Sequence, residues 1–244
     1  SAVSTATEFK SNTIGCNTHR QIDSNGVCNP FVARGLDAFI YGTYSASRFI
    51  IAGTPSGVTL APEGGAHQST ITASIGMELP GVTFIEPTYG TALSWLLADA
   101  ITRVAAGPST LKTAAPYDDG AFYFRLTTRP LDQAPFEAAR KRIGDAVLRR
   151  QVMSGGYRLF DAFEQFPDLR GSDEGERVPM VHLVASGAVM PEVLIAANEL
   201  CSEGVAAHVV DVTSADRWYG SWQRTLRQAV RTASAPSLPG PLWS

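Results

Sequence analysis

The chain has 244 residues, of which 44% are hydrophobic and 18% charged, a composition typical of one large or two ordinary globular domains. The formal net charge is −3, whereas nucleic acids and anionic membranes are bound by clustered Lys and Arg, so neither is an expected partner. The longest apolar stretches are interrupted every few residues by Gly, Ser, Thr or a charge, which argues against a membrane-spanning segment.

The three cysteines, Cys16, Cys28 and Cys201, lack the paired spacing of metal ligands, and an odd number is a poor disulfide framework. A set of Cys16, His19 and Cys28 as metal ligands lacks a fourth ligand at a recognised spacing. The N-terminus has no basic stretch followed by an apolar core, so we expect no signal peptide. These observations predict free thiols in a cytoplasmic protein.

The first half of the chain alternates between helical and strand patterns. Residues 1–29 are polar without a sustained period and are predicted to be a poorly structured lead-in. A helix is expected from Phe31, where apolar residues follow at helical spacing. The remaining expected elements are a strand at 48–53, a loop at 54–66, a short helix at 69–76, a strand at 82–86, a helix at 89–104 and a strand at 121–127.

Residues 131–178 are predicted to be a connector, with a basic amphipathic helix at 136–152 and an exposed charged linker at 168–177. A second α/β unit follows, with strands at 179–185 and 205–210 and helices at 191–203 and 214–231. The predicted fold class is α/β: an open, doubly wound, mostly parallel sheet over residues 30–130, then a partial second α/β domain over residues 179–244. A sheet of two strands is too small to stand alone, so this second unit either packs on the first or belongs to something longer.

Residues 54–68 are the predicted ligand loop. The loop begins at the carboxyl end of a buried strand, which is where open α/β sheets bind ligands. Gly57, Gly64 and Gly65 allow close backbone approach, and Glu63 precedes His67, an imidazole that can shuttle a proton near neutral pH. Composition and position alone leave two interpretations open, a ligand loop and a tight structural connection.

Common catalytic signatures are missing from the sequence: there is no phosphate loop, dinucleotide-binding glycine motif, His-Glu-x-x-His or nucleophile elbow. A hydrolase that pairs Ser56 or Ser69 with His67 therefore has little support. The turn Ser186-Gly187-Ala188 between a strand and a helix could hold an anion on its N–H groups, but a tight structural turn explains it as well.

Two blocks of sequence carry a resemblance to a known family. The stretch NPFVARGLDAF (29–39) resembles the family's Phe-Val-containing helix, and TPSGVTLAPEGGAHQSTIT (54–72) resembles its loop ending in Gly-x-x-His-Gln. Residues 30–101 thereby resemble the pyrimidine-binding domain of transketolase-superfamily thiamine-diphosphate enzymes, most of all the single-chain, homodimeric-type pyruvate dehydrogenase first component. Residues 180–218 resemble the start of the family's C-terminal domain.

The resemblance implies a role for each of five residues. His67 would face the thiazolium of thiamine diphosphate and help with substrate oxygen or proton transfer. The ring of Phe31 would pack on the aminopyrimidine, as aromatic stacking favours, although a core residue of its helix is an equal alternative. Arg34 would lie near the cofactor pocket or on the surface, and Glu63 and Gln68 would shape the loop or lie behind it.

Two departures from the family pattern limit this function. The upstream glutamate that drives the aminopyrimidine to its imino form has no match, since Glu8 is the only nearby carboxylate and its surroundings differ. The diphosphate-binding domain, with its Gly-Asp-Gly segment and its ligands for Mg²⁺, is also missing. The resemblance therefore implies one wall of a site for a 2-oxo acid, completed by a diphosphate-binding domain or subunit in a homo- or heterodimer, with a dehydrogenase complex as a further assembly.

Two functions follow from this pattern. The first is part of a thiamine-diphosphate-dependent pyruvate dehydrogenase or transketolase-like enzyme that is not competent as this chain alone. The second is a non-catalytic scaffold or interaction subunit that keeps the fold but has lost the cofactor-activating glutamate.

Overall fold

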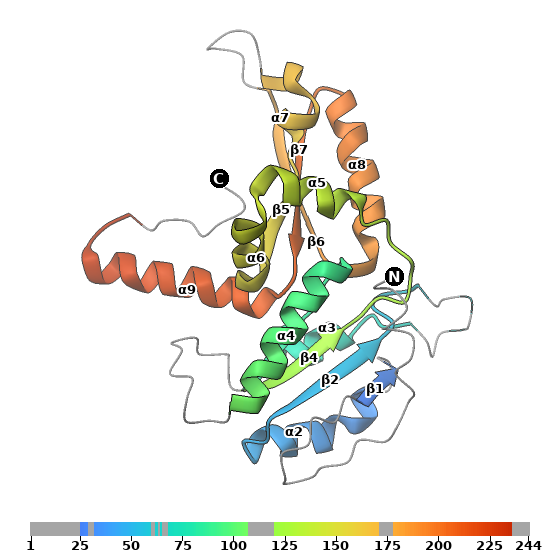
Figure 1. Cartoon of the computed structure of the whole chain (residues 1–244), viewed down its shortest axis with the longest axis vertical. Coiled ribbons are helices and arrows are strands. Elements are labelled where there is room, and N and C mark those ends of the chain that lie inside the picture. The colour runs from blue at the N-terminus through green and yellow to red at the C-terminus, as the bar shows by residue number, and fades with distance from the viewer. Residues whose placement is uncertain are drawn as a thin grey trace.

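Four parallel strands form the first sheet of the computed structural model, which describes residues 25–28, 32–59, 62, 64, 68–106, 120–170 and 178–235 (Figure 1). Their order is β1-β2-β4-β3. The strands predicted at 48–53, 82–86 and 121–127 are confirmed. The bounds are β1 (Asn25–Cys28), β2 (Phe49–Thr54), β3 (Val82–Ile85) and β4 (Ala121–Arg125).

Strand β1 lies inside the segment predicted to be an unstructured lead-in, and it pairs with β2 from Asn25↔Ile51 to Cys28↔Thr54. Four residues are too few to show the alternation that identifies a strand. Its pairing with β2 is a tertiary contact, so the prediction for residues 25–28 is wrong.

Helices cover both faces of the first sheet, as the predicted doubly wound fold requires. Strand β4 shows why, because successive side chains point to opposite faces. Phe122 and Phe124 pack in the core that includes helix α4, whereas Tyr123 packs with Phe39 of helix α2 on the other face. The helix bounds are α2 (Leu36–Tyr44), which follows a 3-10 turn at Ala33–Gly35, α3 (Thr72–Glu78) and α4 (Gly90–Ala106).

The second sheet is mixed and has the strand order β5-β7-β6. Strands β6 and β7 are parallel and are joined through helix α8, which confirms the predicted strand–helix–strand unit. Helix α9 follows β7 and was also predicted. The bounds are β5 (Gly156–Phe160), β6 (Met180–Ala185), a 3-10 turn at Gly187–Val189, α8 (Met190–Ser202), β7 (Ala206–Val212) and α9 (Ala215–Thr232).

The predicted connector contributes a strand to this second sheet. Strand β5 runs antiparallel to β7, so the sheet has three strands and not two. The single helix expected at 136–152 is two helices, because the chain breaks at Gly144, whose φ of 86° is one that glycine adopts readily. The bounds are α5 (Ala134–Ile143), α6 (Asp145–Ser154), α7 (Ala162–Gln165) and a 3-10 turn at Pro167–Arg170.

One hydrophobic core joins the two sheets. Phe136 of α5 lies at its centre, with ring centroids 5.5 Å from Tyr89, 5.9 Å from Trp95 and 5.7 Å from Tyr157. The same core includes residues of β4, α4, β7 and α8. The second unit therefore packs on the first. Within the described part of the chain, no helix is long and apolar enough to cross a membrane.

Candidate functional site

A buried polar cluster lies at the carboxyl edge of the first sheet, where the two ends of the predicted ligand loop meet. Strands β2, β3 and β4 are parallel, so their last residues share one edge, and Ser56, Glu86 and Arg125 lie there. Their exposed fractions are 2%, 5% and 7%. Buried charges are rare unless they are paired, so this cluster has to be internally satisfied.

Arg125 satisfies the cluster through all of its guanidinium nitrogens. Nη1 forms an ion pair with Glu86 Oε1, and Ser56 Oγ donates to the same carboxylate oxygen. Nη1 also lies 3.3 Å from Ser56 Oγ, and Nε lies 3.3 Å from Ser69 Oγ and from Thr72 Oγ1. Nη2 donates to the Ser69 carbonyl. Planar, multidentate arginine suits such a buried node better than lysine would.

The contacts of Arg125 hold both ends of the ligand loop. Ser56 lies where the loop leaves the sheet and Ser69 where the loop returns. The two ends also meet through the backbone, because Ser69 N–H donates to the Gly57 carbonyl at 2.9 Å. Ser56 N–H donates to the Leu126 carbonyl at 2.8 Å, which ties the loop to the end of β4. We call Ser56, Ser69, Thr72, Glu86 and Arg125 the loop clamp.

The second sheet contacts the loop clamp through the turn that precedes α8. A Cβ atom added to Gly187, whose φ is 64°, would lie 2.7 Å from Glu86 Oε1 and 2.8 Å from Ser56 Oγ. Gly187 N–H donates to Thr88 Oγ1 at 2.9 Å, and Glu86 N–H donates to the Thr213 carbonyl at 2.9 Å. The turn 186–188 thus has the tight structural role that was one of its two interpretations, and its glycine is needed for the close approach.

Asp211 is fully buried at this junction between the sheets. Thr88 Oγ1 donates to Oδ1 and Tyr157 Oη donates to Oδ2, each at 2.7 Å. The pKa of Asp211 is raised to about 7, mainly by burial and in part by the nearby charge of Glu86, while the hydrogen bonds from Tyr157 and Thr88 oppose this rise. A carboxyl group with such a pKa changes its charge near neutral pH.

The predicted site residues fall in different places. His67, Phe31 and Glu63 lie outside the described residues, so their roles stay predictions. Gln68 is half-buried and directly precedes Ser69 of the loop clamp. Arg34 is exposed on the 3-10 turn before α2 and is not part of the clamp.

Sequence reasoning missed Glu86, Arg125 and Asp211. A usable signal was present, because Glu86 follows the apolar strand VTFI and Arg125 ends the apolar strand AFYFR. A charged residue at the carboxyl end of a buried parallel strand lies at the ligand edge of the sheet. The sequence analysis identified both segments as strands but did not consider the charged residues at their carboxyl ends.

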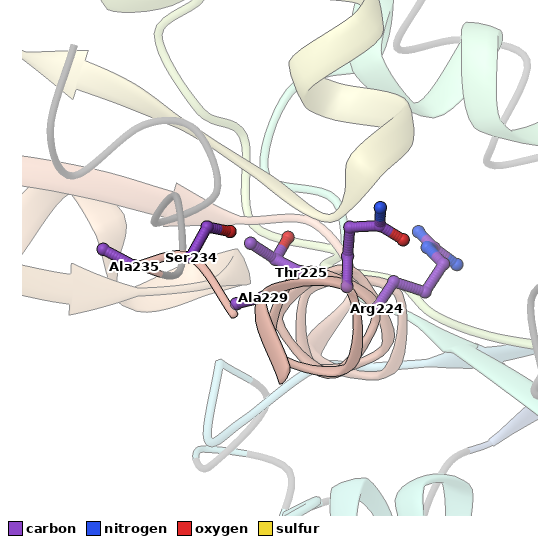
Figure 2. Close-up of a pocket in the computed structure, with 6 residues that line it drawn as sticks. Arg224, Thr225, Ala229, Ser234 and Ala235 are labelled. Atoms are coloured by element: carbon purple, nitrogen blue, oxygen red, sulfur yellow. The ribbon is translucent and has the colours of Figure 1, made fainter. Parts of the chain in front are cut away.

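Two surface pockets lie away from the loop clamp. One runs along the last turns of α9, where Figure 2 shows Arg224, Thr225 and Ala229 opposite Ser234 and Ala235. The other is a groove with mixed charges between α5, β5, α7 and α8, which Lys141 and Arg142 line. Neither pocket includes a residue of the clamp.

The described residues do not by themselves make a complete thiamine-diphosphate site. Ser56, Glu86 and Arg125 are buried and bonded to one another, so they back the loop and do not face a ligand. Among the described residues, no group of three His, Cys, Asp or Glu side chains could hold a metal ion. The edge therefore holds the two ends of the loop, at Ser56 and Ser69.

The architecture is that of an α/β protein with a parallel sheet joined to a second, mixed sheet. This arrangement matches part of the transketolase fold. Transketolase from Leishmania mexicana superposes with a TM-score of 0.54 at 19% identity, over 85% of this chain and 25% of that one. A transketolase mutant from Pichia stipitis gives the same TM-score at 17% identity, over 80% of this chain and 23% of that one.

Sequence comparison finds a similar protein of the same type. The chain is 27% identical over 191 residues to the 6-deoxy-6-sulfo-D-fructose transketolase subunit SqwH of Clostridium sp. (strain MSTE9). The match covers 78% of this chain but 46% of the relative, so the chain spans about half the length of the curated protein that it matches. No family model matches the sequence.

Proposed function

We propose that this chain is one part of a thiamine-diphosphate-dependent, transketolase-type enzyme whose site is completed by another polypeptide. The observation that carries the proposal is the loop clamp, because it holds Ser56 and Ser69, the two ends of the loop, at the edge of the sheet where α/β proteins bind ligands. The partial match to transketolase structures and to a transketolase subunit supports the same assignment.

Within this proposal the chain contributes the pyrimidine-side wall of the site. His67 acts on substrate oxygen or transfers a proton, and Phe31 packs on the cofactor ring. Arg34 lies toward the cofactor pocket from its exposed turn, and Glu63 and Gln68 shape the loop. Thiamine diphosphate supplies, when bound, the nucleophilic carbon that attacks the substrate carbonyl.

In this proposal the partner polypeptide supplies the remaining parts of the site. The diphosphate group and Mg²⁺ require a diphosphate-binding domain, and cofactor activation requires a glutamate. Among the described residues, the buried carboxylates of Glu86, Asp211 and Asp216 are each bonded within the chain. These three carboxylates are therefore unsuited to activating the cofactor, and we assign the activating glutamate to the partner.

The substrate that we propose is a ketose, with transfer of a two-carbon ketol unit. The matches described above are transketolases, and one is named for a sulfonated ketose, so the finer prediction of a pyruvate dehydrogenase with a 2-oxo acid substrate is not supported. A ketose and a 2-oxo acid both present a carbonyl to the same cofactor carbon, and the distinction is therefore tested by substrate and not by cofactor.

A non-catalytic scaffold is the second candidate. The internally bonded state of the three buried carboxylates favours it, because a chain that serves only as scaffold needs no group aimed at a ligand. Binding alone does not separate the two candidates, whereas turnover does.

The experiment combines calorimetry with a His67 variant. Thiamine diphosphate and Mg²⁺ are titrated into this chain alone, into the diphosphate-binding chain of a split transketolase, and into the mixture. We expect binding in the mixture and ketol transfer from a ketose donor. His67→Ala should lower turnover by about a hundredfold or more, which is the usual contribution of a general acid or base, while Thr70→Ala on the exposed loop edge leaves turnover unchanged.

Three outcomes would each count against one part of the proposal. Absence of cofactor binding in every combination would leave the scaffold. Assembly with the partner and cofactor binding, combined with turnover that is insensitive to His67→Ala, would remove His67 from the chemistry. Decarboxylation of pyruvate without ketol transfer would restore the dehydrogenase assignment.

A further inference from the structure

Asp211 is a fully buried carboxyl group at the junction of the two sheets. Thr88 Oγ1 and Tyr157 Oη each donate to it at 2.7 Å. The titratable groups that face it are Glu86, Tyr89 and Tyr157, and within the described residues no cation forms an ion pair with it. A buried charge without a cation is costly, so these surroundings favour the neutral acid.

Thr88 connects Asp211 to the loop clamp through the turn before α8. The hydroxyl group that donates to Asp211 also accepts from Gly187 N–H at 2.9 Å. On its other side Gly187 approaches the clamp, since an added Cβ atom would lie 2.7 Å from Glu86 Oε1 and 2.8 Å from Ser56 Oγ. The turn, which carries no charged side chain, therefore lies between two buried carboxyl groups. Of these two, only Glu86 forms an ion pair within the described part of the chain.

The proton of Asp211 determines how many charges this junction holds. With a pKa of about 7, the carboxyl group is neutral in acid and ionised above neutral pH. Once ionised, it repels the carboxylate of Glu86 on the other side of Gly187, and the charge is cut off from water. Opening of the junction to water would restore the hydration of this charge, so ionisation favours the opened turn.

We propose that Asp211 regulates the ligand site from the second sheet: its neutral form fastens the turn at Gly187 against the loop clamp, and loss of its proton loosens the clamp and both ends of the loop. The inference rests on the proposed function, because it takes residues 54–68 as the ligand loop. Asp211 is a positioning residue in it, since it acts only through Thr88 and Gly187.

The pH window of this regulation follows from linkage. A carboxyl group that the opening exposes to water has an ordinary pKa of about 4, whereas the pKa of Asp211 in the closed junction is about 7. Between these two values the opening releases a proton. The equilibrium constant for opening should therefore rise by about tenfold per pH unit between pH 5 and 7 and level off above pH 7.

The test is hydrogen exchange of the intact chain alone, followed at single amides by NMR between pH 5 and 8. Ser56 N–H and Ser69 N–H report on the loop ends, because they donate to the Leu126 and Gly57 carbonyls. After correction for the intrinsic exchange rate, the protection of both amides should fall by about tenfold or more from pH 5 to 7. Asp211→Asn resembles the neutral acid but cannot ionise, and it should remove this fall.

Val205 N–H provides a control within the same chain. It donates to the Leu200 carbonyl at 2.9 Å, at the end of α8 that is remote from the turn. Its protection should be the same in the wild type and in Asp211→Asn at each pH. A loss at Val205 as large as that at Ser56 and Ser69, and equally reversed by Asp211→Asn, would overturn the proposal, because Asp211 would then act on the stability of the whole chain.

Two glycine variants test the path from the turn to the clamp. Gly187→Ala places a methyl group against Glu86 and Ser56 and should lower the protection of the loop ends at every pH. Gly144→Ala is the matched control, because its φ of 86° is also left-handed but nothing lies within 4 Å of the added atom. Loop ends that respond equally to both variants, or a wild type whose protection is as independent of pH as that of Asp211→Asn, would overturn the proposal.

These exchange measurements require no cofactor, substrate or partner. Loss of protection with rising pH, combined with no binding of thiamine diphosphate in any mixture of chains, would refute the proposed function and leave the coupling to Asp211 in place. Where the assembled chains do bind thiamine diphosphate, the affinity should fall between pH 5 and 7 in the wild type and stay more nearly constant in Asp211→Asn. An equal pH dependence of the affinity in both proteins would overturn the regulation of the site by Asp211.

Discussion

Each sheet has a cluster of charged and polar side chains, buried in the first sheet and partly buried in the second, and the two clusters lie at opposite edges. The loop clamp of the first sheet lies at the carboxyl ends of parallel strands. In the second sheet, His182 and His208 are directly paired across β6 and β7, near the amino ends of these strands, and their rings stack at 5.3 Å. Asp161, which follows β5, lies 3.6 Å from His208 Nδ1. Similar residue types therefore hold the ends of the predicted ligand loop at one edge and pack between strands and a helix at the other.

The difference teaches that similar residue types have different surroundings at the two edges of a sheet. At the loop clamp, the chain leaves the sheet at Ser56 and returns at Ser69. At the histidine cluster the chain instead makes short connections, and His208 Nδ1 accepts from Ala162 N–H at 3.2 Å, at the start of α7. His208 is thus a buried residue that is bonded to the start of a helix.

The largest expected effect comes from breaking the loop clamp. Arg125→Met leaves the carboxylate of Glu86 buried without its cation, which should lower the free energy of unfolding by about 3–5 kcal/mol. Chemical denaturation at fixed pH measures this loss. The double variant Arg125→Met with Glu86→Gln removes both charges and should recover a large part of it. Equal losses for the single and double variants would mean that the ion pair is not the source of the effect.

A smaller effect is expected from Asp211, which lies between the two sheets. Its pKa in the folded chain, about 7, is above the ordinary value, so the folded state holds a proton that the unfolded state has lost. Its contribution to stability is therefore full below about pH 4 and is lost as the pH rises toward and through 7. Asp211→Asn cannot ionise and should gain stability relative to the wild type between pH 4.5 and 8.

Denaturation curves at several pH values test this expectation. Burial also raises the pKa of Asp216, to about 6, and this residue remains in the variant, so part of the pH dependence should persist. A difference between wild type and Asp211→Asn that is the same at every pH would show that Asp211 does not titrate in this range.

The smallest expected effect is at the histidine cluster and has the opposite sign. Burial lowers the pKa of His208, the charge of Asp161 opposes this, and Arg158, His182 and Arg142 lower it further. The folded state then binds fewer protons than the unfolded state, so stability is present above about pH 6.5 and is lost as the pH falls below it.

His208→Asn keeps an acceptor for Ala162 N–H but cannot become charged. We expect it to cost about 1 kcal/mol at pH 8 through lost packing and a weaker hydrogen bond, and to flatten the fall in stability between pH 6.5 and 5. Thermal unfolding at both ends of this range measures the change. An equally steep fall in the variant would assign the acid sensitivity to other groups.

Much of the fold could be predicted from local pattern. The buried strands FIIAGT and VTFI are continuous apolar runs, and α8 begins with proline near its first turn and is followed by Gly204, as helix ends favour. The failures have a common cause. Strands β1 and β5 are short and lie beside longer strands, and their structure depends on a neighbour that is distant in the sequence.

For the candidate site, too, the sequence determined local features and the tertiary structure decided the contacts. The position of residues 54–68 at the end of a buried strand determined that this loop lies at the ligand edge, and a glycine-rich, histidine-bearing composition made it the predicted site. Sequence alone determined no partner for Arg125, because Ser56, Ser69, Glu86 and Arg125 come from four separate segments. Only the tertiary structure decided that these side chains form one clamp, since parallel strands align their carboxyl ends and a buried guanidinium must bond whatever polar groups the fold brings to it.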